Sequence, residues 1–85
     1  MKIFFAKKFR KNYGRLQIRI RAQCDERLRL FETEPFHPLL NNHSVEKRFP
    51  GCRSINVTGD YRGIFKEDGG RVVFVNIGTH SELYS

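Results

Sequence analysis

The stretch that decides the fold is residues 52–77, which read CRSINVTGDYRGIFKEDGGRVVFVNI. Residues 52–58 alternate between apolar and polar side chains, and this period of two predicts a half-buried β-strand. Gly59 and Asp60 are turn residues, and they separate this strand from a second one at residues 61–66. Two strands joined by so short a turn are expected to pair antiparallel.

A hairpin and a third strand follow. Residues 67–70 read EDGG, in which Asp-Gly is a favoured tight-turn pair. Residues 71–77 are almost continuously apolar, which predicts a strand that lies centrally or is covered on both faces. Gly78 and Thr79 interrupt the apolar run, and residues 80–84 are expected to form a short turn of helix.

The first third of the chain predicts a strand and two helices. Residues 2–5 form a short apolar run typical of a strand, and Phe9 and Tyr13 have the spacing of a short helix at residues 6–13. Gly14 is expected to form a turn or C-cap before the second helix. One apolar stripe then has helical spacing and consists of Leu16, Ile20, Cys24, Leu28 and Phe31. Residues 16–21 also alternate between apolar and polar side chains, as a strand would. We predict a helix because no turn residue interrupts the stripe.

The predicted order is β-α-α-β-β-β in a single domain of residues 1–85. Pro35 ends the second helix near Thr33, and residues 35–51 hold all three prolines, as expected of a loop-rich crossing. A helical hairpin packed on one face of a mainly antiparallel sheet makes this an α+β fold. A chain of 85 residues supports only one small core.

The charge of the chain is concentrated at one end. The formal net charge is +7, yet residues 1–30 carry ten Lys or Arg against Asp25 and Glu26. Residues 31–85 carry six basic and seven acidic side chains, so they contribute no excess. This asymmetry indicates an anionic partner such as RNA, DNA or an acidic protein, with a solvated basic helix face as the alternative.

The sequence has no signal for secretion or for a membrane. Lys7 and Lys8 follow the apolar run at residues 3–6 at once, so no signal-peptide core is present, and no apolar stretch approaches the length of a membrane span. We expect a cytoplasmic protein that does not act at a membrane, with Cys24 and Cys52 as free thiols. Two isolated cysteines do not make a zinc site, and no cofactor is predicted.

Residues near the end of the chain suit phosphodiester cleavage. Such a reaction requires a cation for the charge on the phosphate, and groups that take up and release protons near neutral pH. Arg62 offers a bidentate fork to phosphate oxygens, and His80 can carry a proton. Asp60 could orient a histidine or accept a base edge; its alternatives are a turn cap or a salt bridge to Arg62. Tyr84 or Tyr61 could stack on a base.

The same motifs give the chain its resemblance to a known family. The segments HPLLNNH, RSINVTGDYRGIF and VVFVNIGTHSELY, preceded by a helical hairpin, resemble the RelE/ParE superfamily of type II toxins, above all its YafQ-like messenger-RNA interferases. The resemblance covers nearly the whole chain, and its C-terminal half is the specific part. It implies the RelE-like, microbial RNase-like version of the α+β fold.

The resemblance also implies an activity and partners. It implies an endoribonuclease that cuts messenger RNA in the ribosomal A site and so inhibits translation. The ribose 2′-OH attacks without a metal ion, which leaves a 2′,3′-cyclic phosphate and a 5′-OH. A cognate antitoxin, small and acidic, is the implied partner in addition to the ribosome and mRNA. The alternatives are a non-enzymatic ParE-like toxin that binds DNA gyrase, and a catalytically inactive member of the family.

Residue by residue, the resemblance assigns a catalytic set. His43 takes the place of a catalytic histidine, Asp60 matches the acidic residue at the second strand, and Arg62 matches an arginine common in RelE relatives. His80 matches the C-terminal histidine, and Tyr84 takes the place of the aromatic residue that follows it. His43 and His80 are expected to share the two proton steps, with the assignment of base and acid left open.

One position departs from the family pattern. A further histidine of YafQ-like toxins is replaced here by Asn56, which cannot carry a proton at neutral pH but can orient a phosphate or base. Arg53 is a weaker candidate for the phosphate, whereas His37 is expected to be structural. RNA contacts are expected from Arg53, Asn56, Tyr61, Lys7, Lys8, Lys11 and Arg15, since basic side chains bind phosphates with a salt-dependent affinity.

Overall fold

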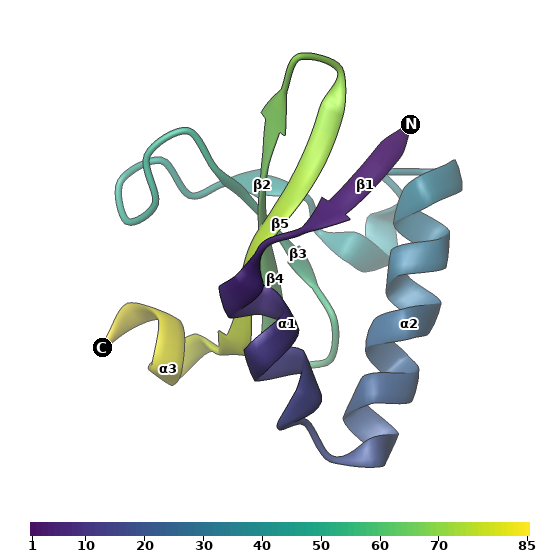
Figure 1. The fold of residues 1–85 in the computed structure, drawn as a ribbon, viewed down its shortest axis with the longest axis vertical. Coiled ribbons are helices and arrows are strands. Elements are labelled where there is room, and N and C mark those ends of the chain that lie inside the picture. Colours follow the sequence, from purple (N-terminus) through teal and green to yellow (C-terminus); the bar gives the residue numbers. More distant parts are fainter.

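Helices and strands lie close to where the sequence predicts them (Figure 1). The computed structural model describes every residue from Met1 to Ser85. In chain order the elements are β1 (Lys2–Phe5), α1 (Lys7–Gly14), α2 (Ile18–Thr33), the 3-10 helix η1 (Pro38–Leu40), β2 (His43–Ser44), β3 (Arg53–Asn56), β4 (Tyr61–Asp68), β5 (Arg71–Thr79) and α3 (His80–Tyr84).

The five strands form one mixed sheet in the order β1-β5-β4-β3-β2. The pairs β2–β3, β3–β4 and β4–β5 are antiparallel. Strand β1 pairs parallel to β5, with Lys2 opposite Arg71. The predicted α+β fold with a mainly antiparallel sheet is therefore confirmed. Strand β5 has a neighbour on each side, as its apolar sequence predicts.

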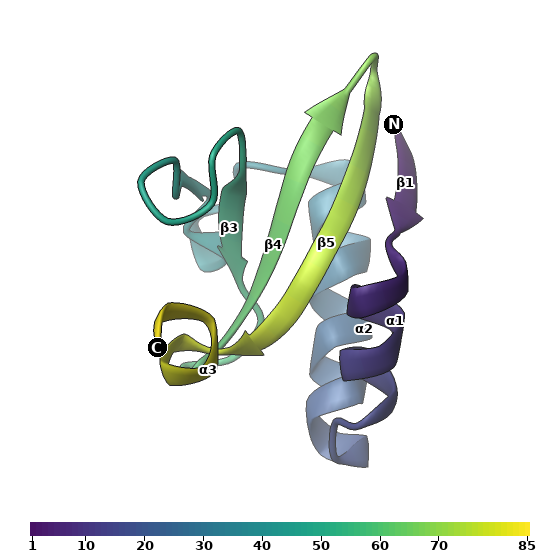
Figure 2. The same ribbon diagram turned by 60° about the vertical axis from the view of Figure 1, so that its left-hand side comes forward.

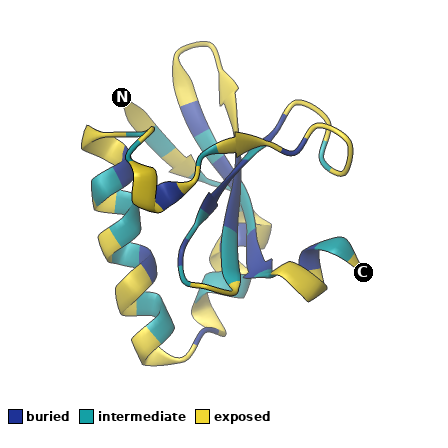
Figure 3. Cartoon of the chain, turned by 180° about the vertical axis from the view of Figure 1, so that it is seen from behind, coloured by how far each residue is buried: buried dark blue, intermediate teal, exposed yellow.

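Different elements cover the two faces of the sheet. Helices α1 and α2 cover one face, whereas α3 and the loop after β2 lie on the other (Figure 2). Buried residues follow the strands and the inner faces of the helices, while the outer helix faces and the hairpin tip are exposed (Figure 3). The larger core cluster lies under the helices, and a smaller one comprises Val45, Cys52, Ile64 and Leu83.

The apolar stripe of the second helix packs as predicted, although the helix begins later. Cys24 and Phe31 are fully buried, and Ile20 and Leu28 pack against the same cluster. Helix α2 starts at Ile18, because Gln17 has an extended backbone and stands at the N-cap. Leu16 is buried from the connection between the helices rather than from the helix itself. No helix is both long and apolar enough to span a bilayer.

The proline-rich crossing holds two elements that the sequence did not predict, η1 and β2. His37 precedes η1, and its Nδ1 accepts a hydrogen bond from the Leu39 amide at 3.1 Å, so the expected structural role of His37 is consistent with its contacts. In the β4–β5 hairpin, Gly69 and Gly70 have φ of 57° and 83°. The turn therefore rests on Gly-Gly rather than on the Asp-Gly pair, because both positions require positive φ.

Phe74 of β5 is the centre of the larger core cluster. It has no exposed surface. Its ring centroid lies 5.3 Å from Phe65, 5.4 Å from Phe31, 5.7 Å from Phe9 and 6.0 Å from Phe5. A single side chain therefore joins β1, α1, α2 and β4 to β5.

Burial of Cys24 predicts a loss of stability at high pH. Desolvation, assisted by the charge of Asp25, raises the pKa of the Cys24 thiol from 9.0 to about 12. Because the folded state disfavours the thiolate, the contribution of the protonated Cys24 thiol to stability is complete below pH 9.0 and is lost as pH rises towards 12. We expect the free energy of unfolding in urea to fall by about 1.4 kcal/mol per pH unit over that range from Cys24 alone.

A Cys24→Ala variant separates this contribution from the other groups that titrate at high pH. The pKa of Tyr13 is also raised, first through its hydrogen bond to Asp25 and to a smaller extent by the charge of Cys24, so the variant keeps the main cause of the Tyr13 shift. The difference between the wild-type and variant slopes above pH 9 measures Cys24. Equal slopes would contradict the prediction.

Candidate functional site

The ends of three strands bring several candidate residues together. In the register of the sheet, Asn56 of β3 lies opposite Arg62 of β4, and Arg62 lies opposite Gly78 of β5. Gly78 leaves room for α3 to fold back, because a Cβ there would lie 3.1 Å from Glu82 Oε1 and 3.5 Å from Leu83 Cγ. Arg62 shares its sheet face with Ile64 of the smaller cluster, so it lies on the face that α3 covers.

The Arg62 guanidinium is oriented by the turn between β3 and β4. Its Nη1 donates to the carbonyl oxygens of Thr58, Gly59 and Tyr61, each at 3.1 Å. Neither Nε nor Nη2 has a protein acceptor, so these two nitrogens are available to an anion. The turn itself is closed by Thr58, whose Oγ1 accepts from the amides of Asp60 and Tyr61.

Asp60 contacts the C-terminal helix through its backbone. The His80 amide donates to the Asp60 carbonyl oxygen at 3.1 Å. The Asp60 carboxylate is exposed and makes neither the turn cap nor the salt bridge to Arg62 that were its alternatives, since the one ion pair in the chain joins Arg71 to Asp68. Asp60 therefore has a free carboxylate, while its backbone lies beside the first residue of α3.

Helix α3 holds His80 and Tyr84 against each other. Thr79 and Glu82 form a capping box, with Thr79 Oγ1 accepting from the Glu82 amide at 3.1 Å and Glu82 Oε1 accepting from the Thr79 amide at 2.7 Å. The His80 and Tyr84 rings stack with centroids 4.5 Å apart. One face of Tyr84 is thus covered by His80, and a base could stack only on the opposite face.

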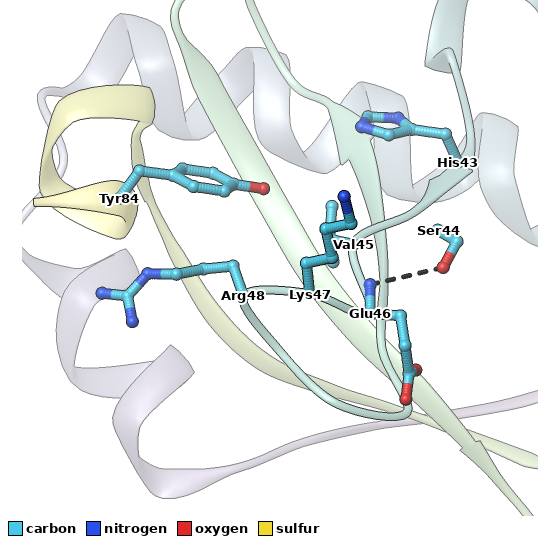
Figure 4. Close-up of a pocket in the computed structure, with 7 residues that line it drawn as sticks. All are labelled: His43, Ser44, Val45, Glu46, Lys47, Arg48 and Tyr84. Atoms are coloured by element: carbon cyan, nitrogen blue, oxygen red, sulfur yellow. Dashed lines mark hydrogen bonds between the residues drawn. The ribbon is translucent and has the colours of Figure 1, made fainter.

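An open cleft of about 500 Å³ lies between the loop after β2 and the end of α3; it is lined by His43, Ser44, Val45, Glu46, Lys47, Arg48 and Tyr84. The hydroxyl end of Tyr84 and the ring of His43 point into this cleft from opposite walls (Figure 4). Two of the five predicted catalytic residues therefore line one cleft. His80 does not line the cleft, but it stacks on Tyr84, which does. Arg62 and Asp60 lie outside the lining of the cleft.

A backbone carbonyl fixes the tautomer of His43. His43 Nδ1 lies 2.7 Å from the carbonyl oxygen of Asn41, a residue in the left-handed conformation with φ of 45°. A carbonyl oxygen can only accept, so Nδ1 carries the hydrogen, and in the neutral ring Nε2 has the free lone pair. His43 is therefore set up to take a proton at Nε2.

Two basic residues of the cleft, Lys47 and Arg48, were not predicted from the sequence. Lys47 extends towards the space between Tyr84 and His43 (Figure 4), where an ammonium group can meet an anion. Both lie in a loop with no periodic pattern, so the only signal was a pair of adjacent basic residues four positions after His43.

Arg53 and Tyr61 lie on the other face of the sheet. Tyr61 packs against the larger core cluster under the helices. Arg53 Nε donates to Asn42 Oδ1 at 2.8 Å, and its guanidinium carbon lies 5.5 Å from the Phe36 ring centroid. Both residues are directed away from the cleft, so we leave them out of the proposed RNA site.

The predicted basic residues of the first helix form a separate surface. Lys7, Lys8, Lys11 and Arg15, together with Asn12, line an open depression of about 570 Å³ that has no hydrophobic residue in its lining. Asn12 Nδ2 donates to Asn76 Oδ1 of β5 at 2.7 Å, which fixes α1 to the sheet. This surface suits an extended anionic partner rather than a small ligand.

Asn56 has a buried carbonyl oxygen, Oδ1, with no hydrogen-bond partner. Such an acceptor is costly to leave unpaired, and its neighbour across the strands is Arg62. An Asn56 amide in this place can hold a ligand by hydrogen bonds but cannot transfer a proton. No three His, Cys, Asp or Glu side chains are grouped as metal ligands would be.

Comparisons with known proteins give a fold but no sequence match. No protein-family profile matches the chain, and no curated protein sequence matches it. Among solved structures, YafQ from E. coli strain BL21(DE3) matches with a TM-score of 0.83 at 20% identity, covering 99% of this chain and 98% of YafQ. The toxin in the E. coli DinJ-YafQ toxin-antitoxin complex matches with a TM-score of 0.79 at 22% identity, covering 99% and 97% of the two chains.

A second type of toxin shares the fold. The YoeB/ParE toxin from Agrobacterium tumefaciens matches with a TM-score of 0.75 at 19% identity, covering 94% of this chain and 99% of the toxin. The fold predicted from the resemblance is therefore confirmed over the whole chain. It is the fold of the YafQ and YoeB toxins, and of the three structures described the two of YafQ superpose better.

Proposed function

We propose, starting from the fold shared with YafQ, that this chain is the toxin of a type II toxin-antitoxin pair and cuts messenger RNA on the ribosome. One observation carries the proposal. His43 and Tyr84 face a common cleft, and His80 stacks on Tyr84 at 4.5 Å beside it. Two imidazoles next to one opening suit a reaction with two proton transfers.

The tautomer of His43 supports a role for it in the first proton step. His43 Nε2 takes the proton of the ribose 2′-OH, and the 2′ oxygen attacks phosphorus. His80 is the group left to protonate the 5′ oxygen as the bond from phosphorus to that oxygen breaks. The stack on Tyr84 at 4.5 Å supports this role, because it holds the His80 ring beside the cleft. The products are a 2′,3′-cyclic phosphate and a 5′-OH.

Two cationic side chains, one at the ends of the strands and one in the cleft, would neutralise the phosphate. Arg62 Nε and Nη2 have no protein acceptor, and they can donate to phosphate oxygens while Nη1 stays on the turn. Lys47 adds a second cation from within the cleft. Asn56 would hold the phosphate or a base through its amide, and the free carboxylate of Asp60 would orient His80 or a base edge.

A partner of opposite charge fits the remaining surface. In the solved complex the E. coli toxin YafQ is bound by the antitoxin DinJ. By analogy, a small acidic antitoxin would neutralise this chain, whose residues 1–30 carry ten Lys or Arg against two acidic residues. The depression along α1 would meet phosphates of ribosomal RNA when no antitoxin is bound.

Induced expression tests the proposal. We expect growth arrest within a generation, and message fragments whose new ends carry 5′-OH groups within translated regions. An SOS response without such ends would indicate the gyrase-binding alternative, and growth without arrest would indicate an inactive protein. Co-expression of the protein encoded by the neighbouring gene is expected to restore growth. If no small acidic protein is encoded there, the antitoxin part of the proposal fails.

A further inference from the structure

We infer that Arg48 is a positioning residue, which holds the C-terminal end of α3 so that the Tyr84 ring stays stacked on His80. The effect on catalysis rests on the proposed function. The structural role rests only on the contacts of Arg48.

Arg48 reaches from the loop after β2 to the end of α3. Its Nε donates to the Leu83 carbonyl oxygen at 3.1 Å, and its Nη2 donates at 3.2 Å to a backbone oxygen of Ser85, the residue that follows α3. The last carbonyl groups of any helix lack an intrahelical partner, and the C-terminal end carries partial negative charge. The guanidinium therefore supplies both the missing donors and the opposite charge.

The loop that carries Arg48 is itself held in place. The amides of Arg48 and Phe49 both donate to the Val45 carbonyl oxygen, at 3.0 and 2.8 Å, and the Cys52 amide donates to the Phe49 carbonyl oxygen at 3.0 Å. The Gly51 amide donates to the Glu46 carboxylate at 2.6 Å. Arg48 thus extends from a turn that these hydrogen bonds hold in place. Its own bonds to α3 fix the helix relative to the wall of the cleft.

The end that Arg48 holds is the end that carries Tyr84. The other end of α3 is fixed by the capping box at Thr79, and the middle is fixed by Leu83, which is 4% exposed. The Tyr84 ring stacks on His80, makes an edge contact with Phe49 at 5.8 Å and packs partly against the smaller core cluster. Without Arg48 the last turn would keep Leu83 in the core but lose the two bonds that flank Tyr84.

The stack of His80 on Tyr84 gives a spectroscopic readout. Protons above an aromatic ring resonate upfield, so the His80 ring protons report the stack directly in an NMR spectrum. In the Arg48→Ala variant we expect these resonances to move towards the position found in Tyr84→Leu, in which the ring is absent. Arg48→Lys is expected to be intermediate, because one ammonium cannot form the two-point fork. Arg71→Ala, an exposed arginine of the hairpin, is the matched control and should not move them.

Cleavage of ribosome-bound message gives the second readout. We expect Arg48→Ala to lower kcat by about 10- to 100-fold with KM little changed, the range that a misplacement of about 1 Å can cause. Far-ultraviolet circular dichroism should match the wild type, since the capping box and Leu83 remain. Unmoved His80 resonances in Arg48→Ala overturn the inference. If the wild-type protein cleaves no message, the proposed function fails, while the resonances still decide the role of Arg48.

Discussion

Replacing His43 with alanine is expected to lower the rate of message cleavage by about 10²- to 10⁴-fold, the usual contribution of a general base. The reason is the hydrogen bond of 2.7 Å between His43 Nδ1 and the Asn41 carbonyl oxygen, which leaves Nε2 free to take the proton of the 2′-OH. The side chain is exposed, so its removal should leave the stability of the fold nearly unchanged. Single-turnover cleavage on programmed ribosomes measures the rate.

His37→Ala is the matched control for this variant. His37 is also an imidazole in the same crossing segment, but its Nδ1 caps η1 and it does not line the cleft. We expect its cleavage rate to stay within a few fold of wild type. Full cleavage and unaltered growth arrest in His43→Ala would contradict the assignment of the base.

Replacing Phe74 with alanine is expected to destabilise the fold by about 3 to 5 kcal/mol, as other large-to-small substitutions of buried phenylalanine do. Phe74 is fully buried among Phe5, Phe9, Phe31 and Phe65, so the cavity would open where four other elements meet β5. A domain of this length has about 4 to 13 kcal/mol of stability in total. The variant should therefore lose a large share of its stability, and urea unfolding followed by circular dichroism measures the loss.

Phe4→Ala removes the same side chain from the surface. Phe4 is 44% exposed and has Arg71 over its ring at 5.6 Å rather than a closed core around it. We expect a loss of less than about 1 kcal/mol, in the range of surface substitutions. A similar loss in both variants would mean that Phe74 is not the centre of the core.

The regular elements were predictable because their side chains alternate between core and solvent with a regular period. The stripe from Leu16 to Phe31 identified α2, and the alternation around Ile55 identified β3. The two residues of β2 and the 3-10 helix η1 are too short to produce a period, so His43 could be assigned only to a loop. Its tautomer depends on the backbone of Asn41, which no side-chain pattern reports.

The sheet face of a candidate residue was harder to predict than its strand. Arg53 lies two residues from Ile55, so the alternation already put it on the helix side, and this argument was available from the sequence. Tyr61 and Arg62 are adjacent and must point to opposite faces, but the face that holds the cleft is set by α3. Lys47 and Arg48 join the cleft because their loop folds over the sheet, and that depends on contacts between distant residues.

The parallel pairing of β1 with β5 has a consequence for synthesis of the chain. The first strand cannot find its neighbour until the residues from Arg71 onwards have been made, because Lys2 pairs with Arg71 and Phe5 with Phe74. Contacts between residues so far apart form late in folding. A nascent chain on a translating ribosome therefore lacks both its main core and α3. If the chain cuts messages, it cannot cut the message of the ribosome that is making it until its synthesis is nearly finished.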